Sequence, residues 1–126
     1  FCKENNIPYV ISLYFDTELK LFDGTPLNEA IAAISELAPE AVSANCIPPS
    51  RFFRAYNFYK DISNGFYFNA SDSDVSSGFP ESRIPPKFFA DDIKRYLNSN
   101  TIFAGSCCGT DPFYTKTIRE TLDEIN

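Results

Sequence analysis

Short apolar segments alternate with amphipathic segments along the whole chain, and this alternation constrains the fold more than any other feature. The apolar segments are rich in β-branched and aromatic residues, as β-strands are, and they cover residues 8–15, 41–45, 66–69 and 101–105. The first is almost entirely apolar, as in a strand buried on both faces. After each segment, apolar residues recur at the spacing of an α-helix with one buried face. The pattern predicts an α/β fold with parallel strands joined by right-handed helical crossovers.

Capping residues indicate where the helices begin. We expect Thr25 to cap the first helix and Ser50 the second, because short polar side chains satisfy the free N–H groups of a first turn. The third helix should begin near Lys87, and Asp111 should cap the fourth. The helical residues expected to face the core are Leu27, Ala30, Ile31, Ile34, Leu37, Phe52, Phe53, Tyr56, Tyr59, Phe88, Phe89, Ile93, Tyr96, Leu97, Tyr114, Ile118, Leu122 and Ile125.

The loops that follow the strands are more irregular than the loops that lead back into them. Residues 70–86 form the longest polar stretch, whereas Asn64 and Gly65 should end the second helical unit. In parallel α/β folds, functional residues gather on the loops at the carboxyl ends of the strands. We therefore expect the functional site at that edge of the sheet.

Composition and charge exclude several classes of function. The net charge is −6 and there is no basic stripe, so nucleic acid is not expected as a partner. No apolar run approaches the roughly 20 residues that span a bilayer, so a membrane is not expected either. The chain contains no histidine, which removes Ser-His and Cys-His nucleophile pairs and every metal site that uses an imidazole. Its 126 residues suit one domain, which we assign to residues 1–126.

Four cysteines remain as soft metal ligands, and they are Cys2, Cys46, Cys107 and Cys108. An even number permits a disulfide framework. Such frameworks are typical of short secreted domains that cannot build a core, which does not describe this chain. We therefore expect reduced thiols and a cytoplasmic location.

Three of these cysteines should lie at the same edge of the sheet. Cys46 directly follows the second predicted strand, and Cys107 and Cys108 follow the fourth. Neighbouring side chains of a strand point to opposite faces, but Gly105 and Gly109 give the backbone freedom to turn both sulfurs toward one centre. Three thiolates there would suit a tetrahedral zinc ion with an open fourth position. Buried, unrelated thiols fit the same spacing, so the residues alone leave both interpretations open.

Two asparagines are predicted at this edge as well. Asn69, at the end of the third strand, could orient substrate or loop backbone, or cap a turn with its own side chain. Asn45, which precedes Cys46, could donate a hydrogen bond to the site or belong to strand-end turn chemistry. We keep both as candidate substrate-binding residues.

Four stretches resemble the homocysteine S-methyltransferase family, which includes betaine–homocysteine and S-methylmethionine–homocysteine methyltransferases. They are "VISLYF…FDGTPLNEAIAAI", "AVSANCIPP", "FYFNA" and "IFAGSCCGTDP", in the order and approximate spacing of that family. The resemblance covers essentially all of the chain, and the motifs are specific in combination. It implies a (β/α)8 TIM barrel of about 250 residues, of which this chain is the C-terminal half with about four βα units.

The resemblance also implies the chemistry. Cys46, Cys107 and Cys108 would bind zinc, and the fourth position would take the sulfur of homocysteine and hold it as a thiolate. That thiolate would attack the methyl group of an activated small-molecule donor and give methionine. The full protein would thus be a methyltransferase of methionine biosynthesis.

The chain departs from the family pattern at three positions and in length. Ser106 stands where the family has a second glycine, Tyr114 where it commonly has a histidine, and Phe68 where a proline often precedes Asn69. None of these removes a zinc ligand, but they leave the methyl donor unassigned.

Because the chain has four βα units and begins with Phe1, we expect a fragment that is inactive alone. It would be completed by the missing N-terminal half of the barrel or by self-association. The alternative is a non-catalytic half-barrel that binds a metal or a partner through the same cysteines.

Overall fold

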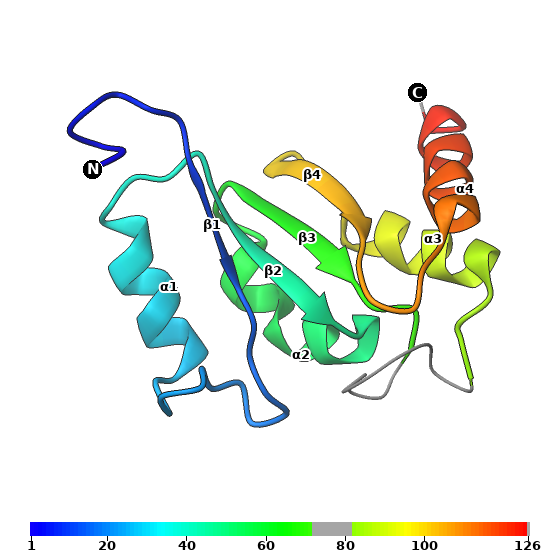
Figure 1. Cartoon of the computed structure of the whole chain (residues 1–126), viewed down its shortest axis with the longest axis horizontal. Coiled ribbons are helices and arrows are strands. Elements are labelled where there is room, and N and C mark those ends of the chain that lie inside the picture. The colour runs from blue at the N-terminus through cyan, green and yellow to red at the C-terminus, as the bar shows by residue number, and fades with distance from the viewer. Residues whose placement is uncertain (72–81, 126) are drawn as a thin grey trace.

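Every strand of the sheet is followed by a helix, as the alternation of the sequence predicts (Figure 1). The computed structural model describes residues 1–71 and 82–125, so most of the predicted loop 70–86 lies outside the described residues. The elements are β1 (Val10–Leu13), α1 (Leu27–Ser35), β2 (Ala41–Ile47), α2 (Pro49–Tyr59), β3 (Asn64–Phe68), α3 (Pro86–Tyr96), β4 (Thr101–Ser106) and α4 (Pro112–Asp123). The strands pair in parallel in the order β1-β2-β3-β4. All strand carboxyl ends therefore meet at one edge.

The core lies between the sheet and the helices. Alternate residues of the strands point into it, as the two-residue period of a strand requires. The core includes Leu13, Val42, Ala44, Phe66 and Phe68 from the strands, and Leu27, Ile31, Phe52, Ala55, Tyr59, Phe89, Ile93, Tyr96, Tyr114 and Ile118 from the helices. Phe52 of α2 is its centre, since its ring lies 5.1 to 5.3 Å from four other aromatic rings. The helices are thus anchored by aromatic packing against one face of the sheet.

The opposite face of the sheet is partly open. Val10 of β1 is 45% exposed and Tyr67 of β3 is 39% exposed, and Ser12 is exposed as well. The prediction that the first strand is buried on both faces was therefore wrong. β1 is an edge strand, and its one apolar residue on the open face, Val10, is exposed.

Two aromatic rings lie flat across this open face. Tyr67 and Phe103 stack with ring centroids 5.2 Å apart. Each ring covers a glycine of the neighbouring strand: a Cβ atom on Gly65 would lie 2.4 Å from the Phe103 ring, and one on Gly105 would lie 2.6 Å from the Tyr67 ring. These two glycines are needed because any side chain would displace the rings.

The helix starts were predicted correctly for α4 and wrongly for α1 and α2. Asp111 caps α4, where its carboxylate accepts a hydrogen bond from a backbone N–H of the first turn. In α1 and α2 the N-cap residues are Pro26 and Pro48, so Thr25 lies one residue too early and Ser50 two residues too late. A proline in an extended conformation leads into each of these helices without a side-chain cap.

The strand ends differ by a few residues from the prediction. β2 continues to Ile47 instead of ending at residue 45, and β3 begins at Asn64. The pair Asn64 and Gly65, predicted to end the second helical unit, is instead part of β3. The Asn64 side chain forms the turn itself, by donating to the carbonyls of Tyr59 and Ile62, while its backbone enters the sheet.

Some residues predicted to face the core are exposed, and they are Leu37, Phe53, Phe88 and Ile125. Phe53 and Phe88 are each next in sequence to a buried phenylalanine on the same helix. Neighbouring residues of a helix point in different directions, which places these two on the solvent side. None of the described helices is long and apolar enough to cross a membrane.

Candidate metal centre

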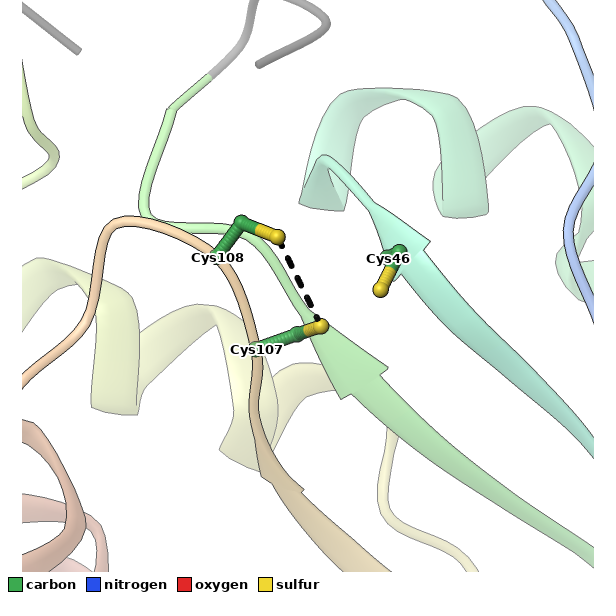
Figure 2. Close-up of side chains that lie close together, drawn as sticks. All are labelled: Cys46, Cys107 and Cys108. Carbon is green, nitrogen blue, oxygen red and sulfur yellow. Dashed lines mark hydrogen bonds between the residues drawn. The ribbon is translucent and has the colours of Figure 1, made fainter. Parts of the chain in front are cut away.

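Three thiols meet at the carboxyl end of the sheet (Figure 2). The Sγ atoms of Cys46, Cys107 and Cys108 all lie within 4.8 Å of one another, and those of the adjacent pair are 3.9 Å apart. β3 separates β2 from β4, and the sulfurs converge over its end. All three are free thiols. The juxtaposition expected from the sequence is therefore present, whereas Cys2 precedes β1 at the other end of the sheet.

A bulge in β2 turns Cys46 toward the other two cysteines. The sequence predicts that Cys46 follows the strand, but the structure places it inside β2. Asn45 pairs with Tyr67 and Ile47 pairs with Phe68, so Cys46 is the extra residue between two paired neighbours. Its φ is +57°, in the left-handed region that residues with a side chain rarely adopt. This local conformation aims the Cys46 sulfur across the end of β3.

The adjacent cysteines are separated by a change of backbone direction after β4. Cys107, the first residue after β4, is still hydrogen-bonded to the end of β3, because its N–H donates to the carbonyl of Phe68 over 2.7 Å. The carbonyl of Cys107 then accepts a 2.6 Å hydrogen bond from the Thr110 hydroxyl, and Gly109 has a φ of +77°. Of the two glycines expected to supply this freedom, Gly109 does so and Gly105 does not, since Gly105 lies within β4 beneath an aromatic ring.

Asn69 lies between the two segments that carry the thiols. Its side-chain N–H donates to the carbonyl of Cys46 over 2.9 Å, and its side-chain oxygen accepts from the N–H of Cys108 over 3.2 Å. The residue is 3% exposed. Of the roles predicted from the sequence, the one seen in the structure is contact with the backbone, which Asn69 makes on both sides of the site.

Asn45 belongs to a row of polar side chains on the open face of the sheet. The Ser43 hydroxyl donates to Ser12 over 2.6 Å, and the Ser12 hydroxyl donates to the side-chain oxygen of Asn45 over 2.7 Å. The two serines were not predicted to belong to the site. A serine within each of two mostly apolar segments was the sequence signal that could have indicated them. Ser12 of β1 and Ser43 of β2 are partners in the register of the two strands.

The surroundings of Cys107 favour its neutral thiol. Burial, followed by the neighbouring Cys46 and Cys108, raises the pKa of Cys107 to about 12. At neutral pH this thiol therefore keeps its proton. A bound cation would reverse the preference, because a thiol that coordinates a metal ion does so as a thiolate.

The three sulfurs fit a tetrahedral metal ion. With Zn–S bonds of about 2.3 Å, neighbouring sulfurs of a tetrahedral site lie ~3.8 Å apart. The adjacent pair already has a separation of 3.9 Å, and the third sulfur lies within 4.8 Å of both. Soft thiolate donors suit zinc, and three protein ligands leave the fourth position for another molecule. Of the three, Cys108 is exposed and Cys46 and Cys107 are half-buried.

A model of the homocysteine S-methyltransferase family matches residues 1–122. The chain belongs to this family. A search of curated proteins finds no match. Among solved structures, the chain is similar to the oxidized form of the homocysteine methyltransferase MmuM from Escherichia coli, with a TM-score of 0.60 and 18% sequence identity. The match covers 94% of this chain and 38% of MmuM, so the chain corresponds in fold to a fragment of the MmuM TIM barrel.

We expect one equivalent of zinc to protect three of the four thiols from alkylation. Cys46, Cys107 and Cys108 would be shielded as metal ligands, whereas Cys2 would react at the same rate with and without the metal because it lies at the other end of the sheet. Mass spectrometry of the chain after timed alkylation measures each site. The variant Cys2→Ser is the matched control and should bind zinc as the parent does. Equal reactivity of all four thiols in the presence of zinc would contradict the assignment.

Zinc affinity should rise with pH. The metal-free site holds a proton on Cys107 at neutral pH, and the metal-bound site does not, so binding releases that proton. For each proton released on binding, the zinc affinity rises by up to about tenfold per pH unit. Calorimetry in buffers of different ionisation enthalpy counts the protons. An affinity that is the same at about pH 6.5 and about pH 7.5 would be inconsistent with protonated thiols in the free site.

Proposed function

We propose that the protein catalyses zinc-dependent transfer of a methyl group to the thiolate of homocysteine, forming methionine. The observation that carries the proposal is the convergence of three cysteine sulfurs within 4.8 Å at the carboxyl end of a parallel sheet. Membership of the homocysteine S-methyltransferase family supports the choice of reaction. Cys46, Cys107 and Cys108 would be the zinc ligands.

Zinc bound to the three thiolates would lower the pKa of a substrate thiol in the fourth position and keep it as a thiolate. The sulfur of homocysteine would then form a bond to the methyl carbon of the donor. The bond between that carbon and the donor breaks, and the donor leaves with the electron pair. This reaction needs no protein base at the sulfur, in agreement with a chain that contains no histidine.

Asn45 is the better supported of the two candidate substrate-binding residues. Its side-chain oxygen is engaged by Ser12, which orients the amide so that the NH₂ group can donate to another molecule. Asn45 also lies on the open face of the sheet, directly before Cys46. We propose that this NH₂ group contacts homocysteine, whereas both ends of the Asn69 amide are already hydrogen-bonded to the protein backbone.

The chain needs a partner to complete a closed barrel. The chain spans 38% of the length of MmuM. β1 and β4 each have a neighbour on one side within the described sheet, and Val10 and Tyr67 are exposed on its open face. We propose that the missing N-terminal half of the barrel, or a second copy of the chain, covers this face. The chain would be inactive alone, and we place the active protein in the cytoplasm, within methionine biosynthesis.

The alternative function is binding of a metal or of a partner without catalysis. It is favoured by the incompleteness of the sheet, since the same three thiols could hold zinc in a half-barrel that lacks the rest of a substrate pocket. The two proposals differ in turnover. Zinc binding without methionine formation by the completed protein would favour the non-catalytic alternative.

The completed, zinc-loaded protein should form methionine from homocysteine and a methylated donor. Chromatography of the products with S-methylmethionine or betaine as the donor measures the rate. We expect Cys46→Ser or Cys107→Ser to lower it by about a thousandfold or more, because each removes a ligand that holds the reacting thiolate in place. Cys2→Ser is the control and should keep the parent rate. Equal rates for Cys46→Ser and the parent would refute the proposed metal site.

The 126-residue chain should not remain monomeric in solution. The sheet edges at β1 and β4, and the exposed Val10 and Tyr67 on the open face, favour association with a second copy or with the other half of the barrel. Light scattering over a range of concentrations measures the state of the chain. A monomer that unfolds in one cooperative transition would show that the open face needs no partner.

A further inference from the structure

We infer that Asn69 is a positioning residue, whose side-chain amide holds the bulge of β2 and the turn after β4 at the separation that the three thiols need to share a metal ion. The inference rests on the proposed metal site, but it concerns a residue that supplies no ligand. It replaces the substrate contact predicted for Asn69 from the sequence.

The bulge leaves a backbone group that the strand ladder does not pair, and Asn69 pairs it. Cys46 is the extra residue in the pairing of β2 with β3. Its carbonyl oxygen accepts a 2.9 Å hydrogen bond from the Asn69 side-chain NH₂ group. A buried carbonyl without a partner would be costly. The amide therefore stabilises the same left-handed backbone conformation that aims the Cys46 sulfur at the other two.

The other end of the amide reaches the second segment. The Asn69 side-chain oxygen accepts a hydrogen bond from the N–H of Cys108. Backbone bonds flank this contact, since Cys107 N–H donates to Phe68 and Ala70 N–H donates to the carbonyl of Cys108. These backbone bonds tie the β4 turn to the end of β3. Through the amide, the turn is also joined directly to Cys46.

The backbone of Asn69 completes the arrangement on the side of β2. Its N–H donates to the carbonyl of Ile47 over 2.9 Å, just after the bulge. Only 3% of the surface of Asn69 is exposed, so water has little access to replace its side-chain contacts. An amide also suits the position chemically. Its NH₂ group is a donor for the Cys46 carbonyl, and its oxygen, bonded to the same carbon, is an acceptor for the Cys108 N–H. A carboxylate would keep the acceptor and lose the donor.

Two substitutions separate the two contacts. Asn69→Ala removes both, and Asn69→Asp keeps the acceptor for Cys108 while placing an anionic oxygen next to the carbonyl of Cys46. Removal of groups that orient metal ligands typically costs about 10–100-fold in metal affinity. We expect a loss in this range for both variants. Asn100→Ala is the matched control: that amide donates to the carbonyl of Lys60, away from the cysteines, and its loss should leave zinc affinity within about twofold.

The experiment is a competition titration of the full chain with zinc and a chromogenic chelator, repeated with cobalt(II). The sulfur-to-cobalt absorption band reports how many thiolates bind. For Asn69→Ala and Asn69→Asp we expect three thiolates to bind still, with weaker affinity and faster metal release. Parent-like affinity in both variants would overturn the inference. So would loss of the fold in both variants, because Asn69 would then be a residue of the core and not one that positions ligands.

Amide hydrogen exchange of the metal-free chain separates this inference from the proposed function. The Cys108 N–H should be protected in the parent and in Asn69→Asp, and should exchange faster in Asn69→Ala, because only alanine removes its acceptor. If the parent binds no zinc, the proposed function fails, while the exchange rates still report whether Asn69 joins the two segments. Equal exchange of Cys108 in all three proteins would overturn the positioning role.

Discussion

The parallel pairing of β3 with both β2 and β4 is the constraint on which the site depends. It places the carboxyl ends of the three strands at one edge. Cys46 and the pair Cys107–Cys108 are far apart in the chain, yet their sulfurs come within 4.8 Å because β3 holds both segments. Aromatic packing around Phe52 behind the sheet keeps the strands in this arrangement. The candidate metal centre therefore depends on the sheet as a whole.

Convergence of the sulfurs requires a local departure from regular strand geometry. A residue with a side chain in the left-handed region costs on the order of 1–3 kcal/mol, and Cys46 adopts that conformation inside β2. The hydrogen bond from Asn69 to its carbonyl offsets part of this cost. The strained backbone of Cys46, the bulge in β2 and the side-chain amide of Asn69 thus form one arrangement. It directs a thiol across the end of a neighbouring strand, which a regular strand would not do.

The same sheet presents an open face with two flat aromatic rings and a row of polar side chains. Gly65 and Gly105 make room for the rings of Phe103 and Tyr67. This is the face of the sheet opposite the helices, and the chain matches a fragment of the MmuM barrel in fold. Family membership and an open four-stranded parallel sheet are therefore consistent with each other.

The alternation of strands and helices, the cap at Asp111 and the gathering of three cysteines at one edge could be predicted from the sequence, because each follows from local periodicity or from the rule that parallel strands end together. The exposure of β1 could not, because an apolar strand looks the same at an edge as in the middle of a sheet. Only the tertiary structure decided that Cys46 occupies a bulge and that Asn69 joins it to Cys108. Both depend on the register between strands, which no local segment of the sequence contains.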